Sequence, residues 1–368
     1  MVILSESPIG LTRALRRLDQ YCKEWDLAVN INKTKIIIFS KGNKISKKYK
    51  WYSDGKEIEI VNNYKYLGIN LTQNGKLGIQ IDEAIKKGKR LLGLVRKRMF
   101  QLKTNNNVKV MEKVFFSMIQ PAMIYGCEVW GEDDKIERLD TVIKSLAKEL
   151  LGVSRNVPGE AALGEIGRIK PKDVIKKRQI LYYYQLKHCK ECVLQRECLK
   201  EMKESVENNK SIFKVEEIWE ENGKKRKMKR RLEEIIWNYQ KKDWETEIKI
   251  KPTLELIGRL GYKKEGQEYV RLFDKEYRRV FTKFKLGNYV WESKKREDGT
   301  RVCCLCNGKE DYNHIIKDCI MLKEERDKIE FLANGEGDVN CVNSLNENEM
   351  KQLILFINYW NEMRKSLL

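Results

Sequence analysis

The residues in this chain best suited to chemistry are three cysteines and a histidine in its last quarter. Cys303, Cys306, His314 and Cys319 follow the spacing C-x2-C-x7-H-x4-C. Zinc prefers four soft ligands in a tetrahedron, and a C-x2-C pair supplies two of them from one tight turn. Gly308 would help the chain to reverse direction after that turn. The spacing therefore predicts one zinc ion. Four protein ligands leave no open position for water, so the predicted role is structural.

Two alternatives to this zinc site are open. Cys304 lies next to Cys303 and could replace it as the first ligand, giving a C-x-C entry. The cysteines could also be free thiols that cluster by chance, although a C-x2-C pair followed by a matched His/Cys pair rarely arises without a metal.

Two further groups of polar residues have simpler explanations than metal binding. A second Cys/His group comprises His188, Cys189, Cys192 and Cys198. It has no turn residues inside it and falls in a helical context, where free thiols are the better interpretation. The carboxylate pair Asp133-Asp134 precedes an apolar-periodic segment, where acidic residues commonly cap a helix.

Other enzyme signatures are absent from the sequence. It contains no Gly-rich phosphate loop, no nucleophile elbow and no His-Glu-x-x-His zinc helix. The only histidines available to a His-centred triad are His188 and His314. Ten cysteines without a secretory leader indicate reduced thiols or metal ligands and a protein that is not secreted.

The charge of the chain points to a polyanionic partner. Its 74 lysines and arginines outnumber its 54 acidic residues, giving a net charge of +20 over 368 residues. Such a surplus attracts nucleic acid first. A membrane partner is not expected, because the longest apolar stretch, Ile36–Phe39, is far too short to span a bilayer.

The first 71 residues show mixed α/β patterns. Ser7 and Pro8 form a cap and first turn for a helix over Leu11–Trp25, and Asp54-Gly55 is a hairpin turn signal. Extended segments are expected over Leu27–Ile31, Thr34–Phe39 and Tyr64–Leu71.

From about residue 80 the apolar period changes to that of helices. One stripe consists of Ile81, Ile85, Leu92, Val95 and Met99. Basic residues occupy the rest of that helix: Lys86, Lys87, Lys89, Arg90, Arg96, Lys97 and Arg98. Further helices are expected over 108–125 (with Met118 and Tyr125 on its apolar stripe and a bend at Pro121), 136–151 (ending at Gly152), much of 172–250, and 350–364. The run Lys224–Arg231 could be a nuclear address, a phosphate-binding face or a solvated surface.

In their order along the chain, these segments resemble the reverse transcriptases of non-LTR (LINE-like) retrotransposons. Met1–Ser5 resembles the strand after the family's Tyr-x-Asp-Asp turn. Leu27–Lys35 resembles motif D, with Asp26 where glycine is common, and Tyr64–Ile69 resembles motif E, the primer-grip hairpin. Gln120–Trp130 resembles a thumb segment of these elements.

The resemblance continues to the end of the chain. Leu151–Arg155 and Ala161–Gly167 extend the thumb match, and Cys303–Cys319 resembles the C-terminal knuckle, with a central spacing of seven instead of the retroviral four. Between 172 and 290 only charge and helicity agree. The implied fold is α+β and mostly α. The implied domains are a palm remnant (1–75) with antiparallel hairpins, a helical thumb (76–170), a basic helical extension (171–295), a CCHC zinc knuckle (296–325) and a C-terminal helix (326–368).

The resemblance also implies roles for individual residues. Lys33 matches the motif D lysine that assists the pyrophosphate leaving group, although by itself it is equally a surface lysine. Tyr66, Leu67 and Gly68 would hold the primer terminus. Phosphates of the template–primer would be tracked, without sequence specificity, by Lys86, Lys89, Arg90, Lys97 and Arg98.

The family's catalytic aspartates would lie in motifs N-terminal to Met1. Polymerases need such carboxylates to hold two metal ions, so neither catalytic Mg²⁺ nor polymerisation is expected from this chain alone. The expected partners are RNA, RNA–DNA hybrid or DNA, and possibly a full-length polymerase of the same element. The alternative is a free-standing zinc-containing nucleic-acid-binding protein with a host role; a Tyr-Ala-Asp-Asp sequence encoded directly upstream would favour the first interpretation.

Overall fold

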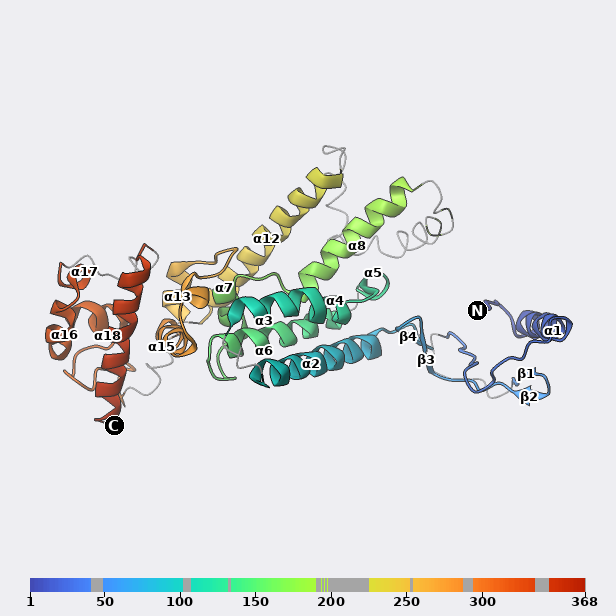
Figure 1. The fold of residues 1–368 in the computed structure, drawn as a ribbon, viewed down its shortest axis with the longest axis horizontal. Coiled ribbons are helices and arrows are strands. Elements are labelled where there is room, and N and C mark those ends of the chain that lie inside the picture. Colours follow the sequence, from blue (N-terminus) through green and yellow to red (C-terminus); the bar gives the residue numbers. More distant parts are fainter. Residues whose placement is uncertain are drawn as a thin grey trace. The chain divides into compact units, whose positions relative to one another are not determined.

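The computed structural model is mostly helical, with small antiparallel hairpins (Figure 1). It describes residues 1–40, 49–101, 107–131, 134–189, 225–251, 254–286, 294–334 and 344–367, together with 193, 195 and 197. The chain divides into two compact units, Met1–Lys86 with Glu132–Ile136, and Lys87–Gly131 with Glu137–Leu368. The predicted mostly helical class with small hairpins is confirmed, whereas the five-part domain division stays a prediction.

The first unit begins with the predicted capped helix. Helix α1 spans Pro8–Glu24, and the Ser7 hydroxyl accepts a hydrogen bond from the Gly10 N–H at 3.1 Å. This cap satisfies one of the free N–H groups of the first turn. The apolar face of α1 packs through Leu15 against a small core formed with Ile36, Trp51 and Ile58.

Two hairpins follow in the same unit. Strands β1 (Tyr52–Ser53) and β2 (Lys56–Glu57) pair around Asp54-Gly55, as predicted, and both turn residues have positive φ. Strands β3 (Asn63–Tyr66) and β4 (Ile69–Thr72) pair around Leu67 and Gly68, with φ of 47° and 86°. The single strand expected over Tyr64–Leu71 is therefore wrong, because the chain reverses in its middle.

Two other expected strands are absent from the described residues around α1. The only pairing there is one parallel bridge between Ile36 and Ile60. The Asn30 side chain accepts the Lys33 N–H at 3.2 Å, and the Asn30 carbonyl accepts the Thr34 hydroxyl at 2.9 Å. Such local bonds compete with a strand ladder and hold the chain in a turn. The strands predicted over Leu27–Ile31 and Thr34–Phe39 are therefore wrong.

Helix α2 (Gly78–Gln101) buries the predicted stripe through Ile81, Ile85, Leu92 and Met99. The next helical region is interrupted: α3 (Val108–Val114) passes into a π-helical turn (Phe115–Ile119) and then α4 (Gln120–Met123). The wider turn precedes Pro121, whose missing N–H makes a regular helix unfavourable there. Met118 and Tyr125, expected on the apolar stripe, are 63% and 56% exposed.

The second unit is otherwise a set of packed helices. Gly152, with φ of 68°, follows the end of α6 (Asp140–Leu150) as predicted. The largest buried side chains include Trp130, Trp244 and Trp360. Its further helices are α5 (Cys127–Trp130), α6, α7 (Gly159–Ile166), α8 (Pro171–His188), α12 (Lys225–Lys249), α13 (Glu255–Leu260), α14 (Tyr269–Leu272) and α15 (Lys275–Lys285). The 3₁₀ turn η2 (Asp134–Leu139), which starts in residues of the first unit, leads into α6.

The C-terminal part carries the Cys/His cluster. Strands β5 (Lys294–Lys295) and β6 (Arg301–Val302) lead into it, and the expected final helix is α18 (Glu347–Lys365). Between them lie η5 (His314–Asp318), η6 (Ile320–Leu322), α16 (Lys323–Asp327) and α17 (Glu330–Ala333). None of the helices in the described ranges is both long and apolar enough to cross a membrane.

Candidate metal centre

The first half of the centre is a tight turn after β6. The Cys303 N–H donates to the Gly308 carbonyl and the Asn307 N–H donates to the Cys303 carbonyl, each at 2.8 Å. The chain reverses between Cys303 and Lys309, with Asn307 at φ of 60° and Gly308 beside it in the same bend, so Gly308 takes part in the reversal as expected. Gly308 also leaves room for the ligands, because a Cβ there would lie 3.0 Å from His314 Cε1 and 3.4 Å from Cys306 Sγ. Glycine lets the backbone approach both ligands.

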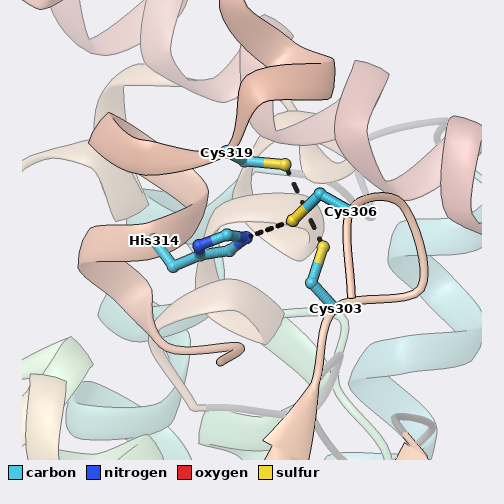
Figure 2. Close-up of side chains that lie close together, drawn as sticks. All are labelled: Cys303, Cys306, His314 and Cys319. Carbon is cyan, nitrogen blue, oxygen red and sulfur yellow. Dashed lines mark hydrogen bonds between the residues drawn. The ribbon is translucent and has the colours of Figure 1, made fainter. Parts of the chain in front are cut away.

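The second half is the π-helical turn η5. His314 begins it, and the His314 N–H donates to Asp311 Oδ1 at 2.9 Å. The Cys319 N–H closes the turn by donating to the His314 carbonyl at 2.7 Å. This wide turn brings the imidazole and the Cys319 thiol to the same side as the Cys303–Cys306 pair (Figure 2).

The four side chains converge on one point (Figure 2). Their ligand atoms all lie within 4.8 Å of one another. Cys303 Sγ is 4.0 Å from Cys319 Sγ, and Cys306 Sγ is 3.2 Å from His314 Nε2. Zinc–sulfur bonds of about 2.3 Å in a tetrahedron place two sulfurs about 3.8 Å apart. The donor set and its spacing therefore suit a single tetrahedral ion, and the sulfurs are too far apart for a disulfide.

The electrostatics of the two buried thiols favour a thiolate. The hydrogen bond from Cys319 lowers the pKa of the Cys303 thiol well below its usual range, and the same contact raises the pKa of Cys319. The pair thus shares a proton, and the thiolate is the form that ligates metals. Cys304 is outside the converging group, and burial raises the pKa of its thiol. The geometry favours Cys303 over Cys304 as the first ligand.

Residues outside the sequence motif hold the centre in place. Arg326 of α16 is buried and donates from Nε to the Ile316 carbonyl and from Nη2 to the Cys319 carbonyl, both at 2.8 Å. Arg364 Nη1 of α18 lies 3.7 Å from Glu310 Oε1, and both side chains are buried. Glu310 belongs to the metal-site loop, which is the segment from Cys303 to Cys319. No local spacing links these residues to the cysteines, so they could not be identified from the sequence.

The predicted primer-grip residues lie at the tip of the β3–β4 hairpin. Leu67 is 72% exposed and Gly68 follows it in the turn. The Tyr64 hydroxyl of β3 donates to the Lys33 carbonyl at 2.8 Å, so the structure links the hairpin to the motif D-like segment. The Lys33 side chain is exposed.

The predicted phosphate-tracking residues share helix α2. Lys86, Lys89, Arg90, Lys97 and Arg98 are all exposed. Lys86 pairs with Glu83 at 3.4 Å, and Arg98 donates to Gln101 at 3.4 Å. Within the described part of the chain, the other three cations have no ion-pair partner.

Several further predictions lie outside the described residues. Cys192 and Cys198 of the second Cys/His group are among them, as are Asp133 and the first residue of the basic run, Lys224. The rest of that run begins helix α12.

Comparison with known proteins gives two relatives. An uncharacterized transposon-derived protein of Caenorhabditis elegans is 23% identical over 191 residues, which cover 49% of this chain and 66% of that protein. A retrovirus-related Pol polyprotein from the type-1 retrotransposable element R1 of Nasonia vitripennis is 24% identical over 347 residues, covering 91% of this chain and 77% of that protein. This chain is related to retrotransposon proteins. No family model matches it.

Proposed function

We propose that this chain is the C-terminal part of a non-LTR retrotransposon reverse transcriptase and that it binds the template–primer duplex. It comprises the end of the palm, the thumb and a C-terminal extension with a structural zinc knuckle. The order of its motifs and a relationship to a Pol polyprotein across 91% of the chain support this proposal.

The basic face of α2 carries the proposal. At 3.6 residues per turn, Lys86, Lys89, Arg90 and Lys97 fall within about 100° of the helix circumference, with Arg98 at the flank. The buried stripe that includes Leu92 occupies the opposite side. A row of exposed cations with so few partners is suited to phosphates spaced along a backbone, and it gives affinity without sequence specificity.

The tip of the β3–β4 hairpin provides a second contact in this proposal. Leu67 combines 72% exposure with φ of 47°. A left-handed conformation costs a residue other than glycine roughly 1–3 kcal/mol and commonly marks a functional position. Contact with the primer terminus would give this exposed apolar side chain a role.

The zinc ion would be held by Cys303, Cys306, His314 and Cys319. Its contribution when bound is structural, since it joins the β6 turn to η5 and leaves no position for a substrate. The residues of the chain orient the ligands: Gly308 admits the imidazole, and Arg326 fixes the carbonyl of Cys319.

The isolated 368-residue chain should not polymerise, because its sequence contains no Tyr-x-Asp-Asp motif to hold the catalytic metals. Primer extension on poly(rA)/oligo(dT) with Mg²⁺ tests this expectation. Incorporation that co-purifies with the chain through successive columns would contradict it.

Fluorescence anisotropy with labelled RNA–DNA hybrids of two unrelated sequences tests the binding face. The variant Lys89→Gln/Arg90→Gln/Lys97→Gln should bind both hybrids more weakly and by the same factor. The slope of log K against log salt should become smaller by about two to three, as expected for the loss of that many phosphate contacts. The matched control removes three exposed lysines elsewhere: Lys249, Lys323 and Lys351. Equal losses in variant and control, or a loss for one sequence only, would overturn the proposal.

A further inference from the structure

A second basic cluster lies on α3 and the segments packed against it, away from the sequence motifs. Lys109, Lys113, Arg168 and Arg271 line a shallow hollow of about 560 Å³ together with Glu112. This volume is within the range of small-molecule sites. The residues come from three distant parts of the chain, so no local pattern in the sequence announces the cluster.

Glu112 organises the two arginines. It is buried, with 3% exposure, and both of its oxygens are used. Arg168 donates from Nε at 3.2 Å and from Nη2 at 3.0 Å, while Arg271 donates from Nε at 3.2 Å and from Nη2 at 3.0 Å. Arg271 also donates to the Ile166 carbonyl at 3.1 Å. Two forked guanidinium groups are thus fixed on one carboxylate, which lowers the entropy cost of further binding.

The lysines give the hollow its excess charge. Lys109 and Lys113 are one turn apart on α3, exposed, and without an ion-pair partner in the described residues. Four cations face a single carboxylate, so the cluster carries a net charge of +3. The Arg168 guanidinium lies 5.3 Å from the centre of the Phe116 ring, which lines the same hollow. One guanidinium balances the charge of Glu112, so the second arginine and both lysines are in excess.

We propose that this hollow binds phosphate groups of a nucleic-acid backbone, at a position separate from the α2 face. Arg271 has its Nε, Nη1 and Nη2 engaged by Glu112 and by the carbonyls of Glu265 and Ile166. Arg168 uses only Nε and Nη2 for Glu112. Its Nη1 can therefore donate to one phosphate, and Lys109 and Lys113 add charge for that phosphate and its neighbour. The inference rests on the proposed nucleic-acid binding and extends it to a second contact. A free nucleotide or inorganic phosphate would present the same chemistry, so the test separates these sources.

The test uses the full chain and the double variant Lys109→Gln/Lys113→Gln. Both side chains are exposed, so the Glu112–arginine core stays intact, and circular dichroism should be unchanged. Anisotropy with a labelled RNA–DNA hybrid should show affinity reduced on the order of tenfold or more at 0.1 M salt, and a log–log salt slope smaller by about two. The control Lys323→Gln/Lys351→Gln removes the same charge from α16 and α18 and should change affinity far less.

The arms of the experiment have distinct meanings. If the wild-type chain does not bind the hybrid, the proposed function fails. If it binds and loses affinity when the α2 face is neutralised, yet Lys109→Gln/Lys113→Gln matches its control, only this inference fails. If inorganic phosphate or a deoxynucleoside triphosphate binds wild type at millimolar concentration and not the double variant, while hybrid affinity in the double variant matches its control, the hollow belongs to a free phosphate ligand and the backbone assignment is overturned.

Discussion

Replacing Cys306 by serine should remove zinc from the chain, whereas replacing Cys304 should not. Cys306 Sγ lies 3.2 Å from His314 Nε2 inside the converging group, and Cys304 is outside it. We expect one zinc per wild-type chain, none in Cys306→Ser and one in Cys304→Ser. The second variant is a matched control, since it removes a thiol two positions away.

The size of the effect follows from the loop that the ion closes. Cys303 and Cys319 are 16 positions apart. A cross-link across about 15 residues stabilises the folded state by about 3 kcal/mol in the chain-entropy model. Its loss raises the local opening equilibrium roughly 100-fold. The opening should be confined to residues 303–319, because the neighbouring segments keep their own buried side chains, among them Leu322 and Trp360.

Mass spectrometry of the native protein measures the metal content, and hydrogen exchange measures the opening. The amides of Ile315 and Cys319, which donate to the Asp311 and His314 carbonyls, should exchange about 100-fold faster in Cys306→Ser. Zinc retained in Cys306→Ser would refute the ligand set. Zinc lost only in Cys304→Ser would move the first ligand by one residue, and unchanged exchange without zinc would refute the structural role.

Two further predictions concern buried charges. Burial lowers the pKa of Lys285 although Glu165 lies 2.8 Å away. Lys285→Met should therefore lower the free energy of unfolding by about 3–5 kcal/mol, because it leaves the buried Glu165 without its counter-charge, and adding Glu165→Gln should restore much of this loss. Urea unfolding measures both variants, and additive losses would contradict the prediction. Burial raises the pKa of Asp140 to about 7, so the unfolded chain releases this proton near pH 4 and the folded chain holds it until about pH 7. The Asp140 contribution to stability is therefore complete below pH 4 and lost as pH rises to 7. Asp140→Asn keeps an acceptor for the Lys172 N–H and carries no charge. Its free energy of unfolding should equal that of wild type at pH 4 and exceed it at pH 7 by on the order of 4 kcal/mol. A difference between the two proteins that does not vary with pH would contradict this.

The features that sequence could predict are those encoded over a few neighbouring residues. The Ser7 cap, the Asp54-Gly55 turn and the Cys/His ligand group depend on local spacing, and the structure has all three. The strand expected around Ile36 failed because hydrogen bonds of Asn30 fix a turn before it.

Contacts between distant segments could not be predicted from a single sequence. Glu112 meets Arg168 and Arg271 across 56 and 159 positions, and neither spacing is periodic in any element. The same holds for Arg326, whose hydrogen bonds to the metal-site backbone depend on how α16 folds back. These charged side chains recur with no helix or strand period, so only the packed structure identifies their partners.

The salt dependence of hybrid binding tests the central claim most directly. Purified wild-type chain is titrated onto a labelled RNA–DNA hybrid at KCl concentrations from about 50 to 200 mM, a range over which phosphate-contacting proteins lose affinity steeply. With at least three cations of α2 on phosphates, log K should fall linearly against log salt with a slope of about −3 or steeper. A slope near zero, or no binding at the lowest salt, would contradict the account.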